Sequence, residues 1–228
     1  AYATAIANIS GGTEDITIDI KEAETEKNTV FVLPMSDSYE ADDEPWITFI
    51  GDSITEENME DLIPESNFDV TFKMNIDVTP DAEARLVFDP KVGDMIKANC
   101  EGNLGIEVSP ETDFAMDGDL LVKGGDYLFT LQNVINKRFV LTEGGIISWD
   151  GNPLEGKLDL EAAYKLKAPL YDIMIGVDTS DIYKQRTDVS CLMDLTGSIN
   201  NPNIKFDIEV PNADQKAKTR VESLSPTR

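Results

Sequence analysis

The clearest pattern in this sequence is a strict alternation of apolar residues with charged or polar ones. From residue 68 to residue 78, every second position is apolar, and the positions between carry aspartate, threonine, lysine or asparagine. A helix would spread such positions around its axis, whereas an extended strand places them on one face. The pattern therefore predicts a strand with one apolar face and one charged face.

The same alternation recurs at residues 96–108, 158–166 and 204–210, and in shorter form at 16–20 and 82–88. Clusters of glycine, proline, asparagine and aspartate separate these runs at short intervals. Short turns join neighbouring strands into antiparallel hairpins and meanders. No long helical pattern interrupts the series, so the sequence predicts an all-β protein without parallel βαβ units.

The alternating runs are longer than ordinary strands. At about 3.3 Å per residue, residues 68–78 would span roughly 35 Å and residues 96–108 roughly 40 Å, although typical strands have about five or six residues. The second value is an upper limit because Gly102 and Gly105 allow a bend. Charge follows the polar face along nearly its whole length, so each strand is expected to have one wet and one dry face.

The alternation predicts a single elongated β domain over residues 1–210. A short apolar strand is expected at residues 30–33, and acidic solvent loops are expected near 21–29, 36–45 and 51–67. Residues 211–228 are polar and predict a tail or linker that is either helical or disordered. The chain starts without methionine and ends in this polar stretch, which is typical of a fragment of a larger chain.

The charge of the chain is strongly acidic. Asp and Glu number 44 against 19 Lys and Arg, giving a formal net charge of −25, while 41% of residues are hydrophobic. Nucleic acids and anionic membrane surfaces attract clustered basic residues, so neither is an expected partner. The longest apolar runs fall well short of the ~20 residues that cross a membrane as a helix.

The sequence has few of the residue patterns that catalysis or metal binding requires. The chain has no histidine, the commonest general base and a common metal ligand. Its carboxylates fall on the exposed phase of strands, whereas an acid–base pair needs a partly desolvated concave site. The stretch from Asp117 to Asp119 lacks the order of an EF-hand loop. The glycine pairs at 124–125 and 144–145 fit hairpin turns better than phosphate loops. We therefore predict a non-enzyme with no catalytic residue, metal or cofactor.

The two cysteines are far apart in the sequence. Cys100 and Cys191 both fall on the apolar phase of alternating runs. Secreted disulfide scaffolds are small and rich in cysteine, and this chain is neither. Buried free thiols are the favoured interpretation, with a single bridge left open.

Three motifs follow one another in the second half of the chain, at residues 123–139, 143–153 and 195–208. In this order they resemble the C-terminal domain of the TamB family, the translocation and assembly module subunit of Gram-negative envelopes. Residues 123–139 match the family's glycine-tyrosine strand. Residues 143–153 match its glycine-rich hairpin, which ends in an aromatic residue and glycine. Residues 195–208 match a segment that runs through glycine and proline into an alternating strand. That segment is carried here by Leu195, Gly197, Pro202 and Ile204. Vaguer similarity reaches back to about residue 30.

The resemblance implies a β-taco, which is a long antiparallel sheet folded lengthwise into a U with an apolar groove inside. It implies membership of the AsmA-like, bridge-like lipid-transfer superfamily. It also implies a periplasmic location, in a parent anchored in the inner membrane by an N-terminal helix that this fragment lacks. The expected partners are phospholipid acyl chains and, through the parent chain, an Omp85-type outer-membrane protein similar to TamA. The resemblance implies no catalytic residues in this sequence.

The apolar strand positions are the predicted lining of that groove. Burying one methylene is worth about 0.8 kcal/mol, so a lipid chain of ~15 carbons gains on the order of 10 kcal/mol. A stripe of similar aliphatic residues offers nearly the same gain at every position, so a lipid could slide along it. The predicted groove residues are Phe68, Val70, Phe72, Met74, Ile76, Leu104, Ile106, Phe114, Met116, Leu120, Leu160, Tyr164, Met193, Phe206 and Ile208.

Three functions fit an alternating all-β chain. The first is a lipid conduit that supports phospholipid transport to the outer membrane and protein assembly there. The second is a structural or adhesive extracellular β-sandwich, whose apolar faces close on each other as a dry core. The third is an outer-membrane barrel, which is weakened because only 7% of residues are aromatic and barrels carry aromatic girdles. The first two differ in whether the apolar face is covered.

Overall fold

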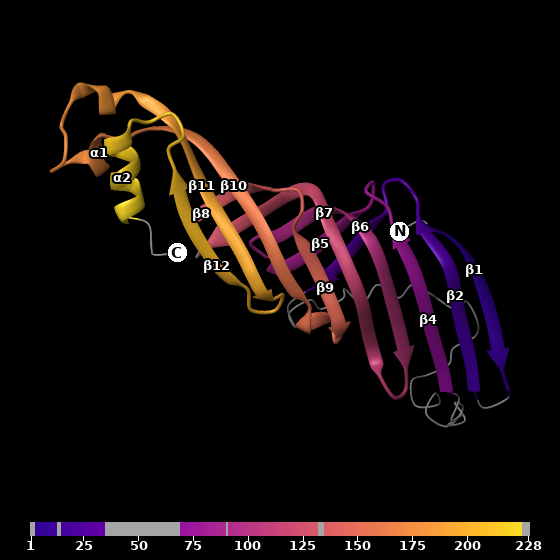
Figure 1. Ribbon diagram of the computed structural model, residues 1–228. Helices are drawn as coiled ribbons and strands as arrows, with labels where there is room; N and C mark the ends of the chain where they lie inside the picture. Colours follow the sequence, from indigo (N-terminus) through magenta and orange to yellow (C-terminus); the bar gives the residue numbers. More distant parts are fainter. Residues whose placement is uncertain (1–2, 13–14, 35–68, 90, 132–134, 225–228) are drawn as a thin grey trace, which may run out of the picture.

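The computed structural model describes residues 3–12, 15–34, 69–89, 91–131 and 135–224, and twelve strands within these ranges form one sheet (Figure 1). The prediction of an all-β protein built on one long sheet is confirmed. Two of the predicted acidic loops, near 36–45 and 51–67, lie outside the described residues, and so does Phe68.

The strands follow one another across the length of the molecule, from β1 at one end to β12 at the other (Figure 1). The first seven are β1 (Ala3–Gly11), β2 (Asp15–Thr25), β3 (Val30–Pro34), β4 (Asp69–Val78), β5 (Glu83–Asp89), β6 (Asp94–Ser109) and β7 (Asp113–Leu131). The remaining five are β8 (Ile135–Leu141), β9 (Ile146–Gly151), β10 (Lys157–Pro169), β11 (Arg186–Ser198) and β12 (Asn203–Glu209).

The acidic loop predicted near 21–29 is shorter than expected, because β2 continues to Thr25. Ala23 and Thr25 are buried at alternate positions, and Glu22 and Glu24 are exposed between them. The backbone N–H of Thr79 donates to the hydroxyl oxygen of Thr25 at 2.9 Å, which ties the end of β2 to the end of β4. The acidic residues therefore mark the solvent side of a strand as well as the turn that follows it.

Two neighbouring strand pairs are parallel, where the sequence predicted antiparallel hairpins and meanders. These pairs are β2 with β4 and β3 with β5. Both β4 and β5 run antiparallel to the single long strand β6, so together they act as one interrupted strand beside it. In the same way, β2 and β3 act as one interrupted strand beside β4 and β5. Parallel neighbours need a long connection of a dozen or more residues. Residues 35–68, between β3 and β4 in the sequence, supply that length.

The interruptions of the strands align across the sheet and form what we call the bend line. The N–H of Cys100 donates to the carbonyl of Ala82 at 3.3 Å, and the N–H of Val122 donates to the carbonyl of Gly145 at 2.8 Å. Cys100 and Val122 are themselves cross-strand partners, beside a register shift. The bend line comprises residues 26–29, 79–82, 99–100, 122–125 and 142–145. Because bulges and breaks increase local curvature, this is where the sheet folds over.

Gly125 lies on the bend line at a position that only glycine fits. Its φ is +135°, and a Cβ placed there would lie 2.0 Å from the carbonyl oxygen of Lys97 on the neighbouring strand. The missing side chain allows β6 and β7 to approach and curve together. The adjacent Gly124 has no heavy atom within 4 Å of the equivalent Cβ.

This difference predicts the outcome of two alanine substitutions. Gly125→Ala should lower the free energy of unfolding by about 2 kcal/mol or more, because the new methyl group forces the paired backbones apart. Gly124→Ala should cost clearly less than Gly125→Ala, because its φ of +158° is close to extended backbone and no heavy atom lies within 4 Å of the new Cβ. Chemical denaturation of both variants measures the difference. Similar small losses for the two would contradict a bend built on close backbone approach at residue 125.

Candidate functional site

Cross-strand register places the apolar positions of the sheet on one surface, which we call the inner face. Residues directly paired in neighbouring strands share a face. Phe72 pairs with Val108, and Val108 pairs with Phe114. The inner face contains every predicted groove residue within the described ranges, namely Val70, Phe72, Met74, Ile76, Leu104, Ile106, Phe114, Met116, Leu120, Leu160, Tyr164, Met193, Phe206 and Ile208.

The opposite surface carries the charges. Lys73 of β4 lies 3.1 Å from Glu107 of β6, and Lys123 of β7 lies 2.8 Å from Glu101. These cross-strand ion pairs stand in water and contribute little to stability, typically up to about 1 kcal/mol each. Their main effect is to give the outer face a solvated surface. The dry and wet faces that alternation predicts are therefore separated by the sheet itself.

Exposure along the inner face rises with distance from the bend line. Leu120, close to the bend line, is only 1% exposed, and Leu160 and Met193 are as fully buried. A single sheet layer cannot bury a side chain this completely unless it folds over its own inner face. The exposure is much larger near the end of β7, at 42% for Phe114, and on the last strand of the sheet, β12, at 36% for Phe206. The inner face is thus a closed core at the bend line and an uncovered apolar surface at strand ends and on β12.

A cluster of aromatic rings occupies the inner face toward the C-terminal end of the sheet. The ring centroids of Tyr127 and Phe129 lie 5.7 Å apart, and those of Phe139 and Tyr164 lie 5.9 Å apart. Phe206 of β12 lies 5.5 Å from Phe129 of β7, although three strands separate β12 from β7 in the sheet. The sheet therefore curls so that its last strand returns against β7 and β8.

Sequence reasoning placed Tyr164 and Phe206 on the inner face but not Tyr127, Phe129 or Phe139. The stretch from 127 to 131 is apolar at four of its five positions, so the alternation is hidden there. The aromatic residues at alternate positions, 127 and 129, were the available sign that these side chains share one face. Their burial depends on the curl of the sheet, which cannot be predicted from a local sequence pattern.

Asp94 is an acid beside the apolar inner face. It opens β6 next to Tyr127, and one of its oxygens, Oδ1, has no hydrogen-bond partner among the described residues. Burial raises the pKa of its carboxyl to about 6, the hydrogen bond from Tyr127 opposes that rise, and the charge of Asp89 adds to it. Burial and then the charge of Asp94 raise the pKa of Tyr127.

A small helical cap covers one end of the inner face, beside the ends of β10 and β11 (Figure 1). It consists of α1 (Tyr171–Met174), the 3-10 turn η3 (Asp181–Lys184) and α2 (Gln215–Leu224). Met174, Tyr183, Ala217 and Val221 form its buried core, and Val189 of the inner face packs against them. Within residues 211–228, for which the sequence offered helix or disorder, the structure has α2. The division into an elongated domain and a tail remains a prediction.

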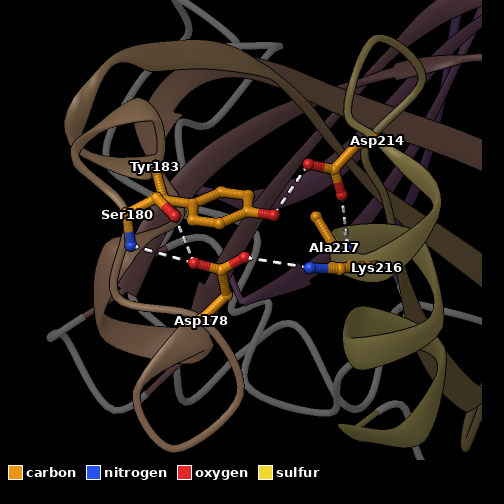
Figure 2. A network of polar contacts seen from close by, with 6 residues as sticks. All are labelled: Asp178, Ser180, Tyr183, Asp214, Lys216 and Ala217. Carbon is orange, nitrogen blue, oxygen red and sulfur yellow. Dashed lines mark hydrogen bonds and ion pairs between the residues drawn. The ribbon is translucent and has the colours of Figure 1, made fainter.

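A polar network joins the parts of the cap (Figure 2). The hydroxyl of Tyr183 donates to Asp214 at 2.7 Å, and the N–H of Ala217 donates to the same carboxylate at 2.9 Å. Asp214 therefore caps the N-terminus of α2. The Ala217 N–H and then the Tyr183 hydroxyl lower the pKa of Asp214, while the bond to Asp214 raises the pKa of Tyr183 to about 12.

Asp178 provides a second link within the cap. It accepts hydrogen bonds from the hydroxyl and from the backbone N–H of Ser180, and it pairs with Lys216 of α2 at 3.2 Å (Figure 2). These bonds, led by the Ser180 hydroxyl, lower the pKa of Asp178. A cavity of about 440 Å³ lies nearby, lined by Tyr183, Arg186 and Asp214 among others. It belongs to the cap, and its lining includes none of the predicted groove residues.

Other functional chemistry is sparse in the part of the chain that the structure describes. No group of three or more potential metal ligands occurs in the described ranges. Both cysteines are free, and burial raises the pKa of Cys100 to about 12, while Cys191 is half-buried. None of the helices among the described residues is long and apolar enough to cross a membrane.

These features define a class of protein: one long β-sheet bent over an apolar inner face, with charges outside. A family model of the TamB C-terminal domain matches residues 4–225, and the chain belongs to the TamB family. No curated protein matches the chain in sequence. The family is a non-enzymatic transport and assembly module of the envelope, associated with protein assembly in the outer membrane.

The exposure gradient predicts opposite outcomes for two glutamates on strand β7. Leu120→Glu puts a carboxylate into the closed core, where an unpaired charge costs several kcal/mol, so the protein should unfold or lose most of its stability. Phe114→Glu lies at the open strand end, where the carboxylate reaches water, and should remain folded. Circular dichroism and thermal melting distinguish them. Equal losses of stability at both positions would contradict the gradient.

Proposed function

We propose that the inner face shields lipid acyl chains, and that the protein supports phospholipid transport to the outer membrane together with protein assembly there. The observation that carries this proposal is the uncovered apolar surface at the strand ends, continuous with the buried core. Soluble proteins rarely leave such surfaces bare unless something binds them. Each acyl methylene moved from water to this surface contributes about 0.8 kcal/mol.

The composition of the inner face supports passage rather than tight binding of one molecule. Along β4 the inner positions are Val70, Phe72, Met74, Ile76 and Val78, which have no charged group among them. A site built for one small ligand has a few convergent polar groups that fix its orientation. A run of similar apolar side chains instead gives an acyl chain nearly equal contacts at successive positions, so barriers to sliding are low.

A closed β-sandwich is the competing architecture, and two observations favour the conduit over it. The twelve described strands belong to one sheet rather than two packed sheets. Inner-face residues near the ends of their strands stay exposed, including Val70 of β4 at 41% and Ile208 of β12 at 47%. A sandwich of two sheets would cover these positions with the facing sheet.

The setting of this activity is the second part of the proposal. We place the chain in the periplasm, within a parent that an N-terminal helix anchors in the inner membrane. The association of the TamB family with outer-membrane assembly supports an Omp85-type partner similar to TamA. The acidic outer face, with the net charge of −25, suits a protein that stands free of anionic membrane surfaces.

A charge placed in the middle of the inner face tests the proposal. Ile106→Glu changes a half-buried residue between Met74 and Met116, and the new carboxylate can still reach water, so the fold should survive. An acyl chain passing this charge loses apolar contact. Lipid transfer between donor and acceptor vesicles should fall about tenfold or more, which corresponds to about 1.4 kcal/mol.

The matched control is Asn103→Glu, which adds the same charge at an exposed position on the outer face of the same strand. It should leave lipid transfer unchanged. Cells whose full-length protein carries Ile106→Glu should become sensitive to detergent, and cells with Asn103→Glu should not. A folded Ile106→Glu protein with normal transfer and normal detergent resistance would count against the conduit. An Ile106→Glu variant that cannot fold would favour the closed sandwich over the conduit.

A further inference from the structure

We propose that Lys137 binds the phosphate of a phospholipid whose acyl chains lie on the inner face, with Tyr164 and Phe206 forming the surface beside it. The proposal rests on the lipid function above and adds a head-group site to it. Lys137 is the only lysine or arginine on the inner face of the strands that the structure describes. It pairs with Phe129 across β8 and β7, whereas its neighbour Arg138 points to the outer face.

Several cations of the outer face are held by carboxylates, and Lys137 is not. Lys73, Lys123 and Arg138 lie within ion-pair distance of Glu107, Glu101 and Asp126, respectively. Among the described residues, Lys137 has no such carboxylate. In a protein with a net charge of −25, a lysine that stands apart from the acidic surface is an unusual arrangement. Its ammonium group is left available to an anion.

The surroundings of Lys137 suit the junction between a polar head and an apolar chain. Its Nζ lies 5.5 Å from the ring centroid of Tyr164, and this cation–π contact positions the ammonium without using its N–H donors. The ring of Phe139 contacts both Tyr164 and Phe206, with its centroid 5.9 Å from that of Tyr164 and 6.1 Å from that of Phe206. Phe206 and the neighbouring Ile208 are exposed on the inner face. A head at Lys137 would therefore have apolar surface next to it.

Two charged residues at opposite ends of the aromatic cluster, Asp94 and Lys137, favour one position for an anionic head group. Asp94 lies at the other end of the aromatic cluster, beside Tyr127. An anionic head is repelled there and attracted at Lys137. Lysine binds phosphate as a compact charge, but the negative field of the whole protein opposes free anions. Binding therefore needs both the phosphate and the chains, so inorganic phosphate alone should not bind.

Calorimetry on the delipidated protein tests this site with three probes. These are a short-chain phosphatidylglycerol, the diacylglycerol with the same chains, and inorganic phosphate. Lys137→Gln should weaken phosphatidylglycerol binding about tenfold and leave diacylglycerol binding unchanged, since a charge-assisted hydrogen bond is lost and the apolar contact is kept. Lys137→Arg should restore most of the affinity. Lys165→Gln, on the exposed outer face of β10, is the control and should have no effect.

The outcomes separate this inference from the proposed function. If phosphatidylglycerol and diacylglycerol bind equally and Lys137→Gln changes neither, the head-group site is wrong and the apolar conduit stands. If neither lipid binds, the conduit itself fails, and the head-group site fails with it. An equal loss from Lys137→Gln and Lys165→Gln indicates a general charge effect and overturns the site. If a fatty acid of equal chain length depends on Lys137 as strongly as phosphatidylglycerol does, specificity for phosphate is wrong.

Discussion

The pleat of the β-strand is the constraint on which the rest of this structure depends. Side chains alternate between two faces, so a strand with charges at every second position has one face that favours water and one that avoids it. Twelve strands in one sheet, most of them alternating in this way, create a large apolar face that no second sheet covers in the described part of the chain. The sheet must therefore fold over its own inner face, and that fold places Leu120 and Leu160 in a dry core.

The same fold cannot cover the apolar face completely. Breaks and bulges in the strands from β2 to β9 concentrate curvature at the bend line, so the sheet closes on itself there and opens toward the strand ends. The helical cap covers part of the face around Val189, but Phe114, Phe206 and Ile208 remain exposed. The buried part stabilises the fold, and the exposed part is the surface available to lipid. Stability and the proposed transport thus use different parts of one continuous face.

Alternation was enough to predict β4, β5, β6, β10 and β12 close to their observed bounds, and the faces of their apolar residues, because it is a local property. The parallel pairing of β2 with β4 could not be predicted, since it depends on a long connection and on the shared partner β6. The alignment of breaks into a bend line also needs cross-strand register. Lys137 escaped notice because residues 135–141 do not alternate, and its face follows only from pairing with Phe129. The TamB resemblance supplied the folded-over architecture that no local pattern contains.

Photo-crosslinking in living cells tests the central claim, that the open part of the inner face carries lipid. A photoreactive amino acid is placed in the full-length protein at Phe114 on the inner face, and in a second variant at Asp117, exposed on the outer face of the same strand. After irradiation, mass spectrometry of the purified protein should find phospholipid adducts at position 114 and none at position 117. Absence of lipid at 114, or equal labelling at both positions, would contradict the account.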